Sequence, residues 1–203
     1  MKLNATEKGL MNNPLRSVLQ RRCEAPLLET LGGRLAGRRA LEIGCGRGVG
    51  TELIFRRFGA CEVHAFDLDP DMVARARRRL SGHPTQRLKL YVADAASVPE
   101  PDASFDAVFD LGIVHHVPDW EAAVAEVVRV LKPGGRFCFE EVTRQALNRW
   151  AYRTFLDHPR ENRFSGTEFV AALEQRDVLV DGGAVERFFG DFVIGVGTKR
   201  ARR

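Results

Sequence analysis

The stretch 40–49 sets the strongest constraint on the fold. A short apolar run ends just before Gly44, two more glycines follow at Gly46 and Gly48, and a helix-like segment begins at Val49. Glycine allows a sharp turn and a close approach of the backbone to a ligand, and the amino end of a helix presents N–H groups without helical partners. The pattern therefore indicates a strand, a ligand-binding turn and a helix in direct succession.

The same alternation of short apolar runs and helix-like stretches continues along the chain. It is typical of a mostly parallel sheet covered by helices on both faces. Between the last expected helix and the fifth strand, Lys132–Gly135 predicts a turn. The expected strands are 40–43, 62–66, 88–92, 105–110 and 136–142, and the expected helices are 49–58, 71–80 and 120–131.

The carboxyl-terminal part of the chain changes character. Ser165 and Glu168 form the spacing of a capping box, so a helix is expected to begin there. Strands are expected at 178–180, 184–189 and 192–197, with a hairpin at Gly190-Asp191. Together these elements predict an α/β fold, a Rossmann-like three-layer sandwich whose mostly parallel seven-stranded sheet has an antiparallel last strand.

A length of 203 residues fits one domain with a substantial core. The expected parts of this single domain are a helical cap at 1–38, a core at 39–142, a helical insert at 143–165 and a helix with a strand hairpin at 166–203. In the insert, one helical face carries Leu147, Trp150, Ala151 and Phe155, and the segment is rich in aromatic residues, namely Trp150, Tyr152 and Phe155. This pattern predicts an apolar lid.

Composition excludes several classes of protein. The chain has 31 Lys and Arg against 27 Asp and Glu, a net charge of +4, and no apolar run long enough to span a bilayer. Its four cysteines are scattered, so neither a disulfide framework nor a metal site is expected. The amino terminus does not resemble a secretory signal, and a cytoplasmic location is predicted. The Arg runs are read as solvated surface, with a polyanionic partner as the alternative.

Five motifs occur in order across 39–142. They are E-I-G-C-G-R-G at 42–48, F-D-L-D-P-D-M at 66–72, V-A-D-A at 92–95, F-D at 105–106 and L-K-P-G-G at 131–135. In this respect the chain resembles the class I S-adenosylmethionine-dependent methyltransferases, and among them the small-molecule group that includes the ubiquinone and menaquinone biosynthesis enzymes.

The resemblance implies S-adenosylmethionine as the cofactor. Asp67 would accept hydrogen bonds from both ribose hydroxyls, as an acidic residue after a second Rossmann strand generally does. Asp94 matches the family position that contacts the adenine amino group. Glu42 has two interpretations, a partner of the methionine amino group or a partner of the turn. The expected cofactor-binding residues are Glu42, Gly44, Cys45, Gly46, Gly48, Asp67, Leu68, Met72, Asp94, Ala95 and Leu111.

The candidate catalytic residues follow the fourth and fifth strands. Ligands of open α/β sheets bind at the carboxyl ends of strands, which is where His115 and His116 fall. His116 is a candidate general base, and the alternative is that both histidines pack the cofactor or shape the loop. Glu140 and Glu141 close the fifth strand and are expected to face the same crevice, with Glu140 as the second catalytic candidate.

The expected activity is methyl transfer to a small acceptor by in-line displacement. Apolar residues of the helical cap and insert suggest an apolar or amphipathic acceptor, such as a quinone precursor, a lipid or a secondary metabolite. A basic amphipathic amino-terminal helix suggests peripheral contact with a membrane. No nucleic acid is expected, and the oligomeric state is left open.

Two alternatives to methyl transfer are an NAD-dependent reductase and a non-catalytic nucleic-acid-binding module. The first is disfavoured because Val49 stands where the dinucleotide motif has its third glycine. The second would use the Arg-rich surface and would bind DNA or RNA in a salt-sensitive way.

Overall fold

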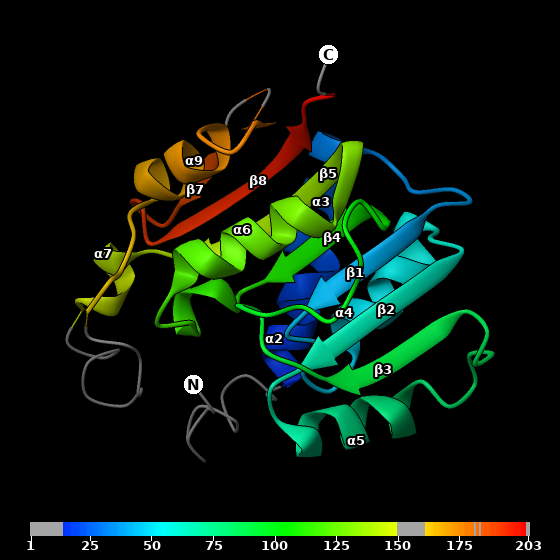
Figure 1. The fold of residues 1–203 in the computed structure, drawn as a ribbon. Coiled ribbons are helices and arrows are strands. Elements are labelled where there is room, and N and C mark those ends of the chain that lie inside the picture. The colour runs from blue at the N-terminus through cyan, green and yellow to red at the C-terminus, as the bar shows by residue number, and fades with distance from the viewer. Residues whose placement is uncertain (1–13, 150–160, 181, 183, 202–203) are drawn as a thin grey trace.

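The computed structural model describes residues 14–149, 161–180, 182 and 184–201. Strands and helices alternate through most of this range (Figure 1). The helices are α2 (Pro14–Leu19), η1 (Gln20–Glu24), α3 (Ala25–Gly32), α4 (Val49–Leu53), η2 (Ile54–Phe58), α5 (Pro70–Arg79), η3 (Val114–His116), α6 (Trp120–Val130), α7 (Arg144–Leu147) and α9 (Gly166–Glu174). The strands are β1 (Arg39–Ile43), β2 (Glu62–Asp67), β3 (Leu88–Val92), β4 (Phe105–Leu111), β5 (Leu131–Val142), β6 (Val178–Leu179), β7 (Val185–Arg187) and β8 (Phe192–Lys199).

All the described strands belong to one sheet. Seven of them follow the order β3-β2-β1-β4-β5-β8-β6, and β7 pairs with β8 as an eighth strand off this path. Strands β1 to β5 are parallel, and β8 runs antiparallel to β5, from Val142 opposite Phe192 to Arg136 opposite Thr198. The predicted sheet, mostly parallel with an antiparallel last strand, is confirmed.

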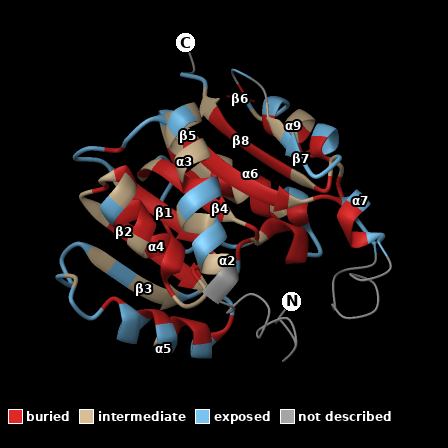
Figure 2. Cartoon of the chain, turned by 180° about the vertical axis from the view of Figure 1, so that it is seen from behind, coloured by how far each residue is buried: buried red, intermediate tan, exposed pale blue. Residues whose placement is uncertain are grey.

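Helices cover both faces of the sheet and form three layers. One apolar cluster joins strand residues to α6 and α9, and a second joins the opposite strand face to α3, α4, η2 and α5. The central strands are buried on both faces, whereas the edge strand β3 and the outer face of α5 are more exposed (Figure 2). Near-continuous apolar strands are what a parallel sheet buried on both sides requires.

Local sequence signals account for most helix starts. The side chain of Asp69 accepts a hydrogen bond from the Asp71 N–H at 3.0 Å and caps α5, with Pro70 at the first helical position. The predicted capping box of α9 is present, since Ser165 Oγ accepts from the Glu168 N–H at 3.2 Å. The α4 helix begins after Gly48, whose φ of +84° is costly for other residues.

Two predictions about the strands need correction. The expected fifth strand, 136–142, begins earlier, at Leu131, and Lys132–Gly135 lies within β5 as an irregularity, where the pairing with β4 shifts between Phe105–Leu131 and Ala107–Arg136. The expected strand 184–189 ends at Arg187, and Phe188 and Phe189 lie in the turn between β7 and β8. The apolar character of these two residues suggested a strand, but they are 68% and 92% exposed.

The helical cap and the lid are described in part. Residues 14–32 form a nearly continuous helical segment with a π-helical turn at Gln20–Glu24. In the insert, Leu147 is buried at the end of α7, whereas Trp150, Tyr152 and Phe155 lie outside the described residues. None of the described helices has the length and apolar character needed to cross a membrane.

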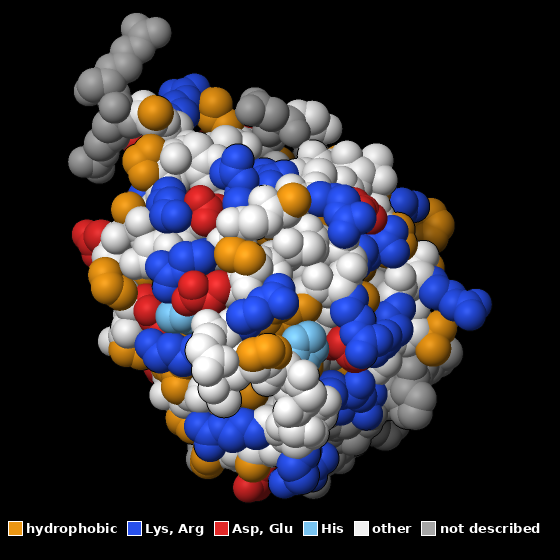
Figure 3. Space-filling view, turned by 90° about the vertical axis from the view of Figure 1, so that its right-hand side faces the viewer, with side chains coloured by type: hydrophobic (Ala, Val, Ile, Leu, Met, Phe, Trp, Pro, Cys, Tyr) orange, Lys and Arg blue, Asp and Glu red, His pale blue; other side chains and the backbone are white. Residues whose placement is uncertain are grey.

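Basic side chains gather at the edge of the sheet where the strands begin. Figure 3 shows Lys and Arg over much of this face, with Asp and Glu among them. Several are paired, including Arg39 with Glu62 at 3.0 Å and Lys132 with Asp106 at 3.0 Å. Exposed pairs of this kind contribute little to stability. This face therefore agrees with the interpretation of a solvated surface.

Candidate functional site

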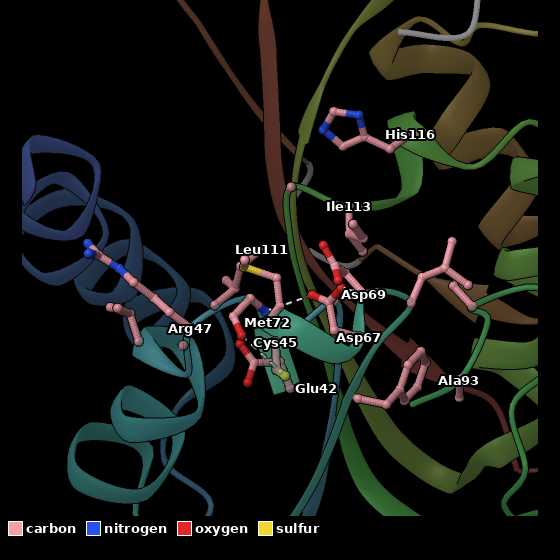
Figure 4. A pocket seen from close by; sticks show the side chains of 18 of the residues that line it. Glu42, Cys45, Arg47, Asp67, Asp69, Met72, Ala93, Leu111, Ile113 and His116 are labelled. Atoms are coloured by element: carbon pink, nitrogen blue, oxygen red, sulfur yellow. Dashed lines mark hydrogen bonds between the residues drawn. The ribbon is translucent and has the colours of Figure 1, made fainter. Parts of the chain in front are cut away.

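A pocket opens at the opposite edge, where β1, β2 and β4 end (Figure 4). Its cavity volume is about 120 Å³, whereas a neighbouring pocket under η1 and α3 has about 10 Å³. Helix α2 and η1 contribute Arg16, Ser17 and Gln20 to its wall. The sequence-predicted residues that line it are Glu42, Gly44, Cys45, Gly46, Asp67, Leu68, Met72, Asp94, Ala95, Leu111 and His116.

The three predicted glycines have different roles. Gly44, at φ +68°, allows Ile113 to pack on the turn, since a Cβ would lie 2.4 Å from the Ile113 Cγ1. Gly46, at φ +50°, has open space where its Cβ would be, and it lines the pocket. Gly48 does not line the pocket: a Cβ there would lie 3.0 Å from Leu80 Cδ1, so this glycine serves the packing of α4 against α5.

Asp67 is the last residue of β2 and points at the glycine turn. Its Oδ2 accepts a hydrogen bond from the Gly46 N–H at 2.9 Å, and its Oδ1 accepts one from the Asp69 N–H at 2.9 Å. Figure 4 shows the Asp67 carboxylate in the middle of the pocket. The carboxylate is thus oriented by two backbone donors, at the end of the strand next to β1.

Glu42 lies deeper, under the first turn of α4. Its carboxyl is buried, accepts a hydrogen bond from the Thr51 hydroxyl, and fits because residue 50 is glycine: a Cβ there would lie 2.0 Å from Glu42 Oε1. Burial raises the pKa of Glu42 to about 8, and the charge of Asp67 adds to this, while the Thr51 hydrogen bond opposes it. The carboxyl is therefore poised to ionise beside a cation.

The remaining predicted residues form the sides of the pocket. Met72 is buried, and Leu68 is exposed at the rim. Asp94 is exposed, with its Oδ1 accepting a hydrogen bond from the Ala96 N–H at 2.9 Å. Cys45 is buried, and burial raises the pKa of its thiol well above the ordinary value, which favours the protonated thiol.

The turn after β4 is held by Glu141. This fully buried carboxylate accepts hydrogen bonds from the Val114 N–H at 2.7 Å and the His115 N–H at 3.1 Å, and lies 2.6 Å from His115 Nδ1. Burial raises the pKa of both Glu141 and the adjacent Asp110, and the charge of Glu141 adds to the rise at Asp110. The histidines therefore separate: His115 is engaged with Glu141, whereas His116 lines the pocket at the end far from Glu42 (Figure 4).

The expectation that Glu140 and Glu141 face one crevice is wrong. Successive residues of a strand point to opposite faces, and Glu140 points toward the helical cap. There its Oε2 accepts from Arg16 Nη2 at 2.8 Å, while Arg16 also pairs with the buried Glu24. Glu140 does not line the pocket, and it reaches the pocket only through Arg16.

Sequence reasoning missed several of these residues. A glycine and a threonine just inside a helix, at Gly50 and Thr51, were a readable signal for a close approach to an acidic residue on β1. Arg16, Ser17 and Gln20 gave no comparable signal, because their place beside the pocket depends on how α2 docks. Arg47 Nη2, from the glycine turn, donates a hydrogen bond to Ser17 Oγ and ties α2 there.

The polar groups along the pocket suit an organic ligand. Glu42, Asp67 and Asp94 offer acceptors along the pocket, between apolar walls that include Met72 and Leu111. Within the described part of the chain, no three His, Cys, Asp or Glu side chains are placed to hold a metal ion.

Comparison with known proteins places the chain in a family. A family model described as a methyltransferase domain matches residues 41–139. The chain is 34% identical over 173 residues to a malonyl-[acyl-carrier protein] O-methyltransferase of Halorhodospira halophila, and the aligned region covers 84% of this chain and 56% of that protein. It is 36% identical to a fatty-acid O-methyltransferase of Mycolicibacterium smegmatis, and here the aligned region covers 68% of this chain and 51% of that protein.

The chain thus spans about half the length of these curated relatives. Among solved structures, a SAM-dependent methyltransferase from Aquifex aeolicus superposes with a TM-score of 0.73 at 21% identity, covering 97% of this chain and 98% of that one. That likeness supports the fold. Together with the motifs and the acceptor-lined pocket, the matches show that the chain belongs to the class I S-adenosylmethionine-dependent methyltransferases.

Proposed function

We propose that the protein transfers a methyl group from S-adenosylmethionine to a small apolar or amphipathic acceptor. The observation that carries the proposal is the Asp67 carboxylate, held by the Gly46 and Asp69 N–H groups at the centre of the pocket. The relatives described above are named as methyltransferases, and they support neither an NAD-dependent reductase nor a nucleic-acid-binding module.

The residues present fit the cofactor. S-adenosylmethionine carries a ribose diol, an adenine and an amino-acid end but no phosphate, so its site needs acceptors. A carboxylate has about four acceptor positions, so Asp67 can orient the turn and hold two hydroxyls together. The open space at Gly46 leaves room for the ligand beside Asp67. We assign Glu42 to the amino group, and Asp94 with the Ala95 N–H to the adenine edge.

The acceptor class is inferred from the relatives and from the wall of the pocket. The two curated relatives are named for a malonyl group on a carrier protein and for fatty acids. In this chain Leu111, Ile113 and Val117 line the pocket, together with His116. An apolar wall of this kind favours an acceptor with a hydrocarbon part.

When bound, the cofactor supplies a methyl group activated by a sulfonium. The chain's own residues have to align the acceptor, exclude water and, for a hydroxyl acceptor, remove a proton. We assign the removal of this proton to His116, because it lines the pocket and histidine is a common general base. Glu140 is assigned a positioning role through Arg16, which lines the pocket in its place.

Calorimetry with S-adenosylmethionine and S-adenosylhomocysteine tests the cofactor assignment. Both should bind with micromolar affinity, and Asp67→Asn should weaken both because an amide has only one acceptor oxygen. Asp106→Asn is the matched control, since this carboxylate lies at the amino end of β4, away from the pocket. Unchanged affinity in Asp67→Asn would contradict the proposal.

A labelled methyl-transfer assay with fatty-acid and hydroxylated apolar acceptors tests the activity. His116→Asn should lower turnover with hydroxyl acceptors and leave the affinity for S-adenosylhomocysteine unchanged. Equal turnover of the two proteins would remove His116 as a base without affecting the cofactor assignment.

A further inference from the structure

Two adjacent phenylalanines stand out from the surface at the tip of the β7–β8 hairpin. Phe188 is 68% exposed and Phe189 is 92% exposed, although both rings are large and apolar. Exposed Arg187 precedes them. Soluble proteins generally expose such side chains together only where they bind something.

The backbone at this tip is unusual for the residues it carries. Phe188 has φ +52° and Phe189 has φ +60°, in the left-handed region that glycine and asparagine adopt most easily. Residues in this region cost free energy and persist where the surroundings hold them. Glycine or asparagine would form the same turn more easily, so the turn itself does not call for phenylalanine.

The tip is held firmly at the edge of the sheet. Gln145 Nε2 donates to the Phe189 carbonyl at 2.6 Å, and Thr143 Oγ1 donates to the Gly190 carbonyl at 2.6 Å. The Phe188 ring packs edge-on against Phe192, with ring centroids 5.8 Å apart. The rings are therefore presented on a fixed support.

This support lies at the same edge of the sheet as the pocket. Phe192, which follows the tip, pairs with Val142 at the carboxyl end of β5. The neighbouring strand β4 ends at Leu111, which lines the pocket, and its carboxyl end is followed by the turn that carries His116. The pocket and the phenylalanine pair thus open on one edge.

We propose that Phe188 and Phe189 anchor the protein to a phospholipid membrane. Two phenylalanine rings bury at most about 500 Å², whereas one side of a stable protein interface buries about 800 Å². A narrow, projecting pair of aromatic rings instead suits the headgroup boundary of a bilayer, where apolar aromatic side chains insert. The inference concerns a surface outside the pocket and stands apart from the proposed methyl transfer.

Vesicle sedimentation of the full chain tests the anchor, with phosphatidylcholine vesicles with and without phosphatidylglycerol. The wild-type protein should sediment with both kinds of vesicle. The double variant Phe188→Asn/Phe189→Gly should bind at least about tenfold more weakly, since burial of one phenylalanine ring alone is worth about that factor.

The double variant also separates an anchor from a structural role. Asparagine and glycine adopt the left-handed backbone more easily than phenylalanine, which offsets the lost contact between Phe188 and Phe192. The melting temperature of the variant should therefore stay close to that of the wild type. Binding of S-adenosylhomocysteine should be unchanged. A lower melting temperature would show that the rings serve the fold and would overturn the proposal.

The exposed pair Val18 and Leu19 on α2 provides the matched control. Val18→Ser/Leu19→Ser should sediment like the wild type. Wild-type protein that stays in solution, or a hairpin variant that binds vesicles as the wild type does, would overturn the proposal. Loss of binding in the α2 variant alone would assign membrane contact to the helical cap instead.

Discussion

The buried Glu42 carboxyl should release a proton when the cofactor binds. Its pKa is raised to about 8 in the unliganded protein, so at pH 7 about 90% of the molecules carry the proton. An ammonium group beside the carboxyl favours the ionised form. Binding at pH 7 should therefore release close to one proton from Glu42.

The same linkage sets the direction of the pH dependence. Below pH 8 the cofactor has to displace the proton, so binding is weaker there and recovers as the pH rises through about 8. One pKa unit corresponds to about 1.4 kcal/mol, or about tenfold in affinity. Relative to Glu42→Gln, the wild type should gain about tenfold in affinity from pH 6 to pH 7, and little more above pH 8.

Calorimetry in buffers of different ionisation enthalpy, such as phosphate and Tris, counts the protons directly. Comparison with Glu42→Gln removes the titration of the ligand itself, because the amide has the shape of the acid but no titrating proton. Equal proton release in the two proteins, or none in the wild type, would refute the assignment of Glu42 to the amino group.

Two further predictions concern stability and use thermal or urea unfolding. Gly50→Ala should destabilise the protein by about 1–3 kcal/mol and weaken cofactor binding, because the new methyl would clash with Glu42 Oε1. Gly82→Ala is the control, since the Cβ position of Gly82 has open space around it. Arg16→Met should lower the free energy of unfolding by about 3 kcal/mol, since it leaves Glu24 and Glu140 buried without their cation. Arg22→Met, at an exposed position, is the control, and an equally small effect of the two substitutions would contradict the prediction.

The sequence predicted those parts of the fold that have a strong local sequence signal. Strand β3 occupies the predicted residues, and β1, β2 and β4 agree within a residue at each end, because their apolar runs are bounded by polar or glycine positions. Asp67 was found for the same reason: it ends a strand, and the topology fixes where a strand end lies.

The errors have a common physical origin. How far a side chain is exposed, and which group it points toward, depends on residues that are distant in the sequence. Phe188 and Phe189 have the apolar character of a strand, yet the hydrogen bonds from Thr143 and Gln145 fix them in a turn. Glu140 and Glu141 could have been separated by the two-residue period of a strand. The contact between Glu140 and Arg16 could not have been predicted, because 124 residues separate them in the chain.

The position of β8 has a consequence for synthesis on the ribosome. This strand lies between β5 and β6, although it follows both of them in the chain. While the nascent chain grows, the outer edge of β5 has emerged but its partner has not, and an unpaired edge is open to pairing with other chains. A chain cut short before Phe192 would keep that edge exposed. We therefore expect premature termination in this region to give aggregates rather than a smaller folded protein.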